Sequence, residues 1–187
     1  MKRLKVSFVR ARYPSVWEPT NLMYVSAFIK NKYQGNLEVQ ILDGFFETDE
    51  QIINKISGSD YVGFSGTTPQ VPHIKKLSKL VKEEYPSMKT IAGGYGPSLQ
   101  PFTFLNDPTI DYLVVGEGEQ SMLDILNGNI SEKLVSNKPI MDVDSIPNPD
   151  RDSIDLNRYI SIAEKDEGRR VTSIMTERGC AFGCTFC

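Results

Sequence analysis

Three cysteines lie within the last eight residues of the 187-residue chain. Cys180, Cys184 and Cys187 form a CxxxCxxC run, which gathers three thiolates on one short loop. Three thiolates can bind three irons of a 4Fe-4S cluster and leave the fourth iron open to another ligand. Because the chain has no fourth cysteine and its single histidine, His73, is distant in sequence, a four-ligand zinc site is disfavoured. We therefore predict an iron–sulfur site, with a chance group of thiols or a partial zinc knuckle as the alternative.

Glycine and small polar residues follow three short segments that are rich in β-forming residues. Glycine leaves the backbone bare for a flat ligand, while hydroxyl groups supply hydrogen bonds without filling a crevice. Ligands of doubly wound sheets bind at the carboxyl ends of the strands, so we predict that the three runs line one cleft. The alternative is that each run is only a tight strand-to-helix turn. The runs are Ser65, Gly66, Thr67 and Thr68; Gly93, Gly94, Tyr95 and Gly96; and Gly116, Glu117, Gly118 and Glu119.

These loops require a scaffold, and the apolar pattern alternates between short β-rich runs and longer helical stretches. This alternation predicts a parallel sheet flanked by helices. We predict an α/β, three-layer flavodoxin-like or Rossmann-like fold with five strands in the order 2-1-3-4-5. The predicted strands span residues 4–10, 37–43, 61–65, 90–93 and 112–116. The predicted helices span residues 21–32, 102–105 and 119–126, and two more begin at a capping box at 48–51 and at Pro72.

The composition changes after about residue 130. Residues 131–170 contain several prolines and many Asp and Asn residues, which suit an extended linker better than a core. The segment from Val171 to Met175 predicts one more strand, which runs into the cysteine loop. We therefore divide the chain into an α/β domain at 1–130, a linker at 131–170 and the start of a second domain at 171–187.

Composition and charge exclude several classes of protein. Charged residues make up 24% of the chain and the net charge is −3, so the field of the protein repels phosphate backbones and nucleic acid is not an expected partner. The apolar runs are far shorter than the roughly 20 residues that span a bilayer. No apolar signal-peptide core follows the N-terminus, and we expect a cytoplasmic protein without a membrane span.

The glycine loops resemble those of the cobalamin-binding domain over residues 4–127. The features in common are a Ser-x-small run after the third strand, Gly-Gly after the fourth and Gly-Glu-Gly-Glu after the fifth. The resemblance implies that the nucleotide tail of cobalamin enters between strands one and three, near Ser65, Thr67, Gly93 and Gly94, while residues 116–119 border the cleft.

One departure from the wider family concerns the cobalt ligand. Mutase-type members carry Asp-x-His-x-x-Gly after the first strand, and this sequence lacks that motif. We interpret His73 as an exposed or cap-adjacent residue, so the lower face of cobalt has no protein ligand that the sequence identifies. The absence points toward radical enzymes and away from mutases.

The cysteine run resembles the signature of radical S-adenosylmethionine enzymes. Phe186 precedes the last cysteine and Arg178-Gly179 leads into the first, as is typical of that family. The resemblance implies that S-adenosylmethionine chelates the open iron and is cleaved to a 5′-deoxyadenosyl radical, with an electron donor such as flavodoxin or ferredoxin. Because the chain stops at the third cysteine, we expect an N-terminal fragment whose truncated catalytic barrel begins at 171. The implied parent is a methyltransferase or a related radical-based modifying enzyme of unidentified substrate and catalytic residues.

Two other functions stay open. A radical enzyme of this kind can carry a flavodoxin-like domain that binds substrate in place of cobalamin. The chain can also be a non-enzymatic α/β binding module, as in receiver domains of similar topology. A receiver domain needs an acidic pair after the first strand, where this sequence has Arg10, Ala11 and Arg12.

Overall fold

The computed structural model describes residues 3–180 and 182–185, and its centre is a parallel sheet. The strands are β1 (Leu4–Arg10), β2 (Leu37–Asp43), β3 (Tyr61–Ser65), β4 (Lys89–Gly93), β5 (Tyr112–Val114) and β6 (Leu134–Val135). Their order is β2-β1-β3-β4-β5-β6, which confirms the predicted order of the first five. The predicted number of five is wrong, because β6 pairs with β5 and adds a sixth strand.

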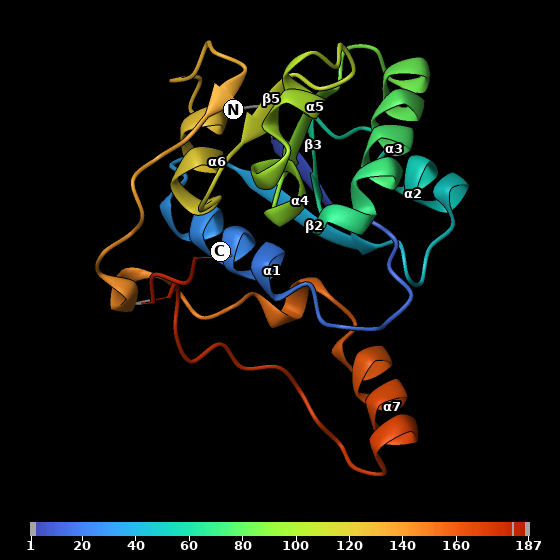
Figure 1. Ribbon diagram of the computed structural model, residues 1–187. Helices are drawn as coiled ribbons and strands as arrows, with labels where there is room; N and C mark the ends of the chain where they lie inside the picture. Colours follow the sequence, from blue (N-terminus) through green and yellow to red (C-terminus); the bar gives the residue numbers. More distant parts are fainter. Residues whose placement is uncertain (1–2, 181, 186–187) are drawn as a thin grey trace.

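Helices cover both faces of the sheet, which gives the predicted three layers (Figure 1). The helices are α1 (Thr20–Lys32), α2 (Asp49–Lys55), α3 (Val71–Glu84), α4 (Tyr95–Leu99), α5 (Pro101–Leu105), α6 (Glu119–Leu126) and α7 (Leu156–Glu167), with 3-10 turns η1 (Thr68–Gln70), η2 (Val143–Ser145) and η3 (Arg151–Ser153). On one face, α1 and α6 surround a core that includes Phe8, Met23 and Ile125. On the other face, α2 and α3 enclose a core that includes Phe64 and Leu77.

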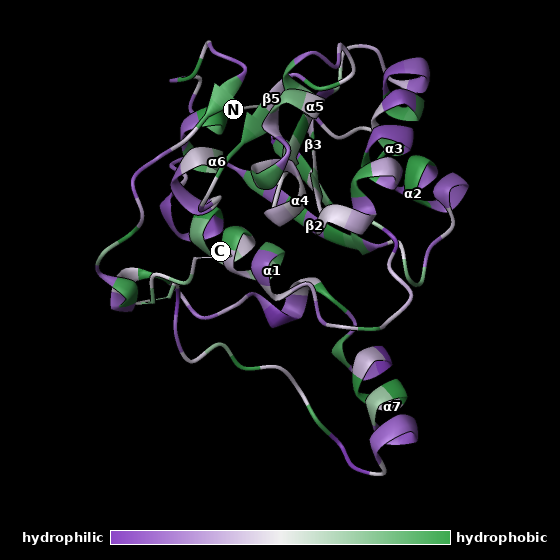
Figure 2. Ribbon diagram, viewed as in Figure 1, coloured by the Kyte–Doolittle hydropathy of each residue, from purple (hydrophilic) through white to green (hydrophobic). Residues whose placement is uncertain are grey.

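The local sequence explains where the central helices begin. At α2, the Thr48 hydroxyl accepts from the Gln51 N–H (3.2 Å) and the Gln51 side chain accepts from the Thr48 N–H (2.9 Å), so the predicted capping box is confirmed. Pro72 lies in the first turn of α3, where its missing N–H has no helical partner to lose. The strands are apolar, whereas α2 and α3 turn polar residues outward (Figure 2). Burial of their apolar stripes therefore fixes both helices on the sheet.

The segment predicted as a linker contains regular structure. It supplies β6 to the sheet, and it supplies α7, whose Tyr159 hydroxyl donates to Asp43 Oδ2 (2.6 Å). A two-residue strand is too short to show a period of two. Helix α7 is amphipathic but buries Tyr159 alone, and the Pro, Asp and Asn residues before it favoured the linker prediction.

The strand predicted at Val171 to Met175 is wrong, because these residues have no regular secondary structure. The Ser173 N–H donates to Glu18 Oε1 (3.2 Å), and its carbonyl accepts from Arg151 Nη2 (2.6 Å). A strand needs a neighbouring backbone for its hydrogen bonds, and side chains take that place here. Within residues 3–180 and 182–185, no helix has the length and apolar character required to cross a membrane.

Candidate functional site

The carboxyl ends of four strands form a continuous row across the sheet. The register pairs Arg10 with Asp43 on one side and with Ser65 on the other, and Ser65 with Gly93. Adjacent strands lie only about 4.7–4.9 Å apart. The structure thus brings together the serine loop after β3 and the Gly-Gly loop after β4.

The loop after β3 has some of its polar groups bonded within the protein. Ser65 is buried, and its hydroxyl oxygen accepts a hydrogen bond from Asn21 Nδ2 (2.7 Å). The backbone N–H and the hydroxyl of Thr67 both donate to Gln70 Oε1, at 2.7 and 3.0 Å. Thr67 and Thr68 are themselves exposed. The loop therefore presents Thr67 and Thr68 at the surface, while the hydroxyls of Ser65 and Thr67 are already bonded to Asn21 and Gln70.

Two glycines after β4 are required by contact between the loops. Gly94 has φ +87°, and a Cβ there would lie 2.6 Å from Ser65 Oγ. The Gly96 N–H donates to the Gly66 carbonyl (2.9 Å), and a Cβ on Gly96 would lie 2.6 Å from the Thr67 carbonyl oxygen. Any side chain at either position would push the two loops apart.

Two other glycines at the same edge are not required by a close contact. A Cβ on Gly93 would be in ordinary contact with Val114 (3.6 Å), and a Cβ on Gly116 would meet nothing within 4 Å. The backbone at Gly116 therefore faces open space, and Gly93 has no side chain of its own to hinder an incoming group. These two positions, rather than Gly94 or Gly96, are the glycines at which a ligand can approach the main chain.

Exposed apolar side chains border this edge. Trp17, in the loop after β1, is 66% exposed, and Tyr95 and Leu99, after β4, are 77% and 71% exposed. Apolar surface that remains in water often marks a binding site. Trp17 and Leu99 were not among the predicted site residues, since nothing in the sequence alone distinguishes them from core residues.

A cavity of about 520 Å³ opens at the end of β1, within the size range of small-molecule sites. His73 lines it but has both ring nitrogens engaged. Nδ1 accepts from the Arg12 N–H (2.7 Å), so the proton is on Nε2, which donates to Asp49 Oδ1 (2.9 Å). Burial raises the pKa of Asp49, but hydrogen bonds from Lys76 and His73 outweigh it and lower the pKa to about 2. His73 lies in the first turn of α3, as predicted, yet its side chain is only 14% exposed. The cavity is lined by Arg12, Tyr13, Pro14, Phe45 and His73.

The two glutamates of the Gly-Glu-Gly-Glu run contact later parts of the chain. Glu117 Oε2 accepts from the Ile140 N–H (2.8 Å). Glu119 is buried, and its Oε1 accepts from Arg178 Nη2 (2.6 Å). Both were predicted to bind a cofactor, and in the structure each carboxylate has a partner within the protein.

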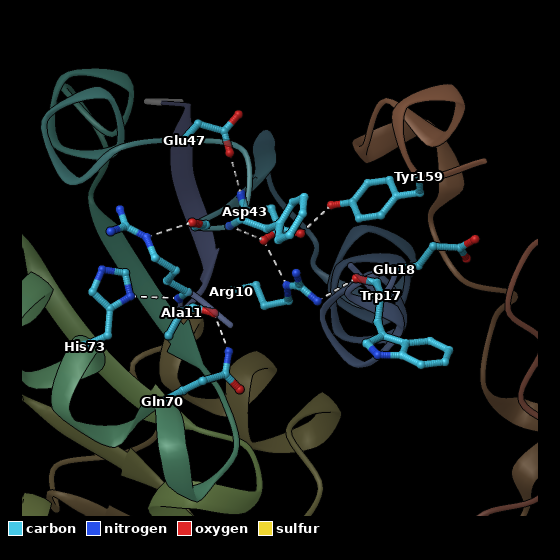
Figure 3. Close-up of polar contacts among 12 residues, drawn as sticks. Arg10, Ala11, Trp17, Glu18, Asp43, Glu47, Gln70, His73 and Tyr159 are labelled. Atoms are coloured by element: carbon cyan, nitrogen blue, oxygen red, sulfur yellow. Dashed lines mark hydrogen bonds and ion pairs between the residues drawn. The ribbon is translucent and has the colours of Figure 1, made fainter. Parts of the chain in front are cut away.

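A buried ionic cluster that the sequence did not reveal lies at the ends of β1 and β2 (Figure 3). Arg10 Nε donates to Asp43 Oδ1 (2.8 Å), and Nη1 donates to the Trp17 carbonyl (2.6 Å). Burial, followed by the charge of Asp43 and the hydrogen bond to it, raises the pKa of Tyr159, so this phenol stays protonated. Arg10 Nη2 is buried and has no hydrogen-bond partner among the described residues. Only the strand register pairs Arg10 with Asp43, which is why sequence reasoning missed the cluster.

The cysteine run is described only in part. Cys180 and Cys184 are free and exposed, and Cys187 lies outside the described residues, as does Phe186. No three His, Cys, Asp or Glu side chains converge in a way that could hold a metal ion within residues 3–180 and 182–185. The three-thiolate cluster stays a prediction.

The chain is similar to several known proteins. The model of a family described as the B12 binding domain matches residues 6–126. The chain is 26% identical to an anaerobic magnesium-protoporphyrin IX monomethyl ester cyclase of Rubrivivax gelatinosus, over 98% of this chain and 38% of the cyclase. It is 28% identical to a cytidylyl-2-hydroxyethylphosphonate methyltransferase of Streptomyces wedmorensis, over 93% of this chain and 44% of the methyltransferase. The chain thus spans about two fifths of the length of these relatives.

A solved structure supports the fold. The crystal structure of a cobalamin-binding protein from Desulfitobacterium hafniense has a TM-score of 0.50 and 14% sequence identity with this chain. The match covers 70% of this chain and 60% of that protein. At this level of identity the likeness concerns the arrangement of the α/β sheet.

Proposed function

The chain belongs to the B12 binding domain family, whose model matches residues 6–126, and from this membership we propose that the carboxyl edge of its sheet binds cobalamin. One observation carries the proposal. Open backbone at Gly93 and Gly116 lies at the same edge as the exposed rings of Trp17 and Tyr95. A broad, flat macrocycle needs a surface without protruding side chains, and its apolar rim gains from contact with such rings.

The polar groups at this edge suit the amide side chains that a corrin ring carries. The exposed hydroxyls of Thr67 and Thr68 both donate and accept hydrogen bonds. We place the nucleotide tail between β1 and β3, where Ser65 and Thr67 are bonded to the amides of Asn21 and Gln70. A tail that enters there exchanges hydrogen bonds with these two amides, which offer both donors and acceptors. When bound, cobalamin supplies a cobalt centre for group transfer.

His73 does not ligate cobalt in this proposal. Its Nδ1 accepts from the Arg12 N–H and its Nε2 is bonded to Asp49, so neither nitrogen has a free lone pair directed at a ligand. The domain therefore would supply the surface on which the ring and its tail lie, and this chain would supply no histidine ligand to cobalt.

The parent protein, in our proposal, is a radical S-adenosylmethionine enzyme of methyltransferase or related type. The cyclase and methyltransferase relatives support this assignment. The donor set fits a 4Fe-4S cluster, since Cys180 and Cys184 are free, exposed thiols four residues apart and Cys187 completes the run. S-adenosylmethionine would occupy the remaining iron, and a flavodoxin or ferredoxin would supply electrons. Residues 131–170 would connect the cobalamin domain at 1–130 to the cluster domain that begins at 171.

Cobalamin binding is tested by mixing the purified chain with hydroxocobalamin and recording the visible spectrum after gel filtration. We expect the chromophore to elute with the protein and to quench the fluorescence of Trp17, which is the only tryptophan. Gly116→Ala should weaken binding, whereas Gly128→Ala should not. Both glycines have positive φ and nothing within 4 Å of a Cβ, but Gly128 follows the far end of α6. A chain that retains no chromophore contradicts the proposal and favours a domain that binds substrate.

A further inference from the structure

We propose that Glu18 and Glu119 are positioning residues that hold the segment before the cysteines against the cobalamin edge. The inference rests on the proposed function, because it gives this edge and the cysteine loop a common role. Neither carboxylate would need to contact a cofactor. Each acts on the segment that precedes the cysteines.

Glu18 binds the residues that sequence analysis assigned to a strand. Its Oε1 accepts from the Thr172 hydroxyl (2.7 Å) and the Ser173 N–H (3.2 Å), and its Oε2 accepts from Arg151 Nη1 (3.1 Å). Arg151 in turn donates to the Thr172 hydroxyl (2.9 Å) and the Ser173 carbonyl (2.6 Å). The backbone of Ser173 is thus held on its N–H side by a carboxylate and on its carbonyl side by a guanidinium.

Glu119 binds the same segment six residues beyond Thr172. Its Oε1 accepts from Arg178 Nη2 at 2.6 Å, and the Arg178 guanidinium lies 5.0 Å from the centre of the Tyr24 ring on α1. Glu119 is the first residue of α6, where the partial positive charge of the helix end also favours a carboxylate. Arg178 is therefore held between the two helices that share one face of the sheet.

Both carboxylates are buried, and a buried charge needs a partner. The side chains of Glu18 and Glu119 are each only 4% exposed. A charged group so far from water is stable only when it is paired and hydrogen bonded. The partners of Glu18 come from residues 151, 172 and 173, and the ion-pair partner of Glu119 is Arg178, so both carboxylates stay paired in the docked arrangement and favour it.

The two contacts determine where the cysteine loop lies. After α7 the chain runs back toward α1 and α6 (Figure 1). Cys180 follows Arg178 by two residues, which span at most about 7 Å of extended chain. Since the Arg178 guanidinium is held at the start of α6, Cys180 is tethered to the end of the sheet where the Gly116–Gly118 turn precedes this helix. That turn belongs to the proposed cobalamin edge.

The test combines hydrogen exchange with limited tryptic cleavage on the full 187-residue chain, with the fragments identified by mass. In Glu18→Gln, the Ser173 amide should exchange about tenfold faster than in wild type, since a neutral amide oxygen is a weaker acceptor. In Glu119→Gln, trypsin should cleave after Arg178 several-fold faster, because the Arg178 side chain is only 17% exposed while it is paired with Glu119. Glu119→Asp keeps a carboxylate at the start of α6 and should be cleaved more slowly than Glu119→Gln. Glu117→Gln is the matched control, since Glu117 contacts Ile140 and should leave cleavage after Arg178 unchanged.

Hydroxocobalamin binding to the same variants separates this inference from the proposed function. Retained binding in Glu119→Gln, together with faster cleavage after Arg178, supports the positioning role. Lost binding with unchanged cleavage makes Glu119 a cofactor contact and overturns the inference, as does wild type that is cleaved as fast as Glu119→Gln. If the variants show these changes but wild type binds no cobalamin, the proposed function fails while the docking contacts stand.

Discussion

Replacing Gly94 by alanine should destabilise the fold by about 4 kcal/mol. The Gly94 backbone, at φ +87° and ψ −174°, lies in a region that essentially only glycine adopts, so a Cβ there costs about 1–3 kcal/mol. The new Cβ would lie 2.6 Å from Ser65 Oγ, which forces that hydroxyl away from Asn21 and loses a hydrogen bond of about 1 kcal/mol. Contacts of 3.1 and 3.2 Å with the Gly66 backbone add steric strain of about 1–3 kcal/mol. The lower chain entropy of unfolded alanine offsets only about 0.4–1 kcal/mol.

Thermal unfolding followed by circular dichroism measures this loss. For a chain of this size, 1 kcal/mol corresponds to about 2–4 °C, so Gly94→Ala should lower Tm by about 8–16 °C. Gly116→Ala has nearly the same φ (+86°) but no neighbour within 4 Å, and should lower Tm by about 2–4 °C. Gly93→Ala has neither a positive φ nor a close contact, and should stay within about 2 °C of wild type.

The comparison also separates folding from binding. Gly93→Ala should fold normally yet bind hydroxocobalamin about tenfold more weakly, a difference of about 1.4 kcal/mol. Equal melting of the Gly94→Ala and Gly116→Ala variants would refute the argument from loop contact. A Gly94→Ala variant that melts within about 2 °C of wild type would do the same.

Two further predictions concern Tyr159 and Asp49. Tyr159→Phe keeps the ring but removes the 2.6 Å bond to Asp43, so protection of α7 in hydrogen exchange should fall by about 2 kcal/mol. Tyr85→Phe, which removes a longer 3.3 Å bond to a carbonyl, is the control and should change protection by less than about 1 kcal/mol. Because the folded pKa of Asp49 is lowered from 3.8 to about 2, its stabilising effect is present above pH 3.8 and is lost as the pH falls toward 2. An acid titration by circular dichroism should therefore show a shallower decline for Asp49→Asn, and identical profiles would contradict this assignment.

The central sheet was predictable because each strand and helix has its own local signal. The capping box at Thr48 depends only on residues within one helical turn, and so does the position of Pro72 at the start of α3. The parallel arrangement followed from the alternation of β and α segments, and the predicted strand order is that of flavodoxin-like sheets. By contrast, β6 exists only because β5 offers it a free edge, and residues 171–175 lack a strand because Glu18 and Arg151 bond to Ser173. Such contacts between residues far apart in sequence cannot be read from local pattern.

The predicted glycines of the site also fall into two groups, those without a close contact and those that contact a neighbouring loop. Gly93 and Gly116 have no close contact, whereas Gly94 and Gly96 serve contact between loops. All four positions are glycine, so the sequence alone does not distinguish them. The register of β3 with β4 pairs Ser65 with Gly93 and so brings Gly94 against Ser65, whereas Gly116 follows β5 and has no such neighbour.

The Gly-Glu-Gly-Glu run shows why a motif need not be one binding site. Its Gly116 N–H lies 3.2 Å from Ser98 Oγ at the exposed edge, and a Cβ on Gly116 would meet nothing. Its glutamates turn the other way, Glu117 to Ile140 and Glu119 to Arg178. A cofactor that lay on the glycines would therefore rest on a turn whose second glutamate, Glu119, holds the chain leading to the cysteines. If cobalamin and the cluster act on one substrate, this turn is the element that would hold them in a common frame.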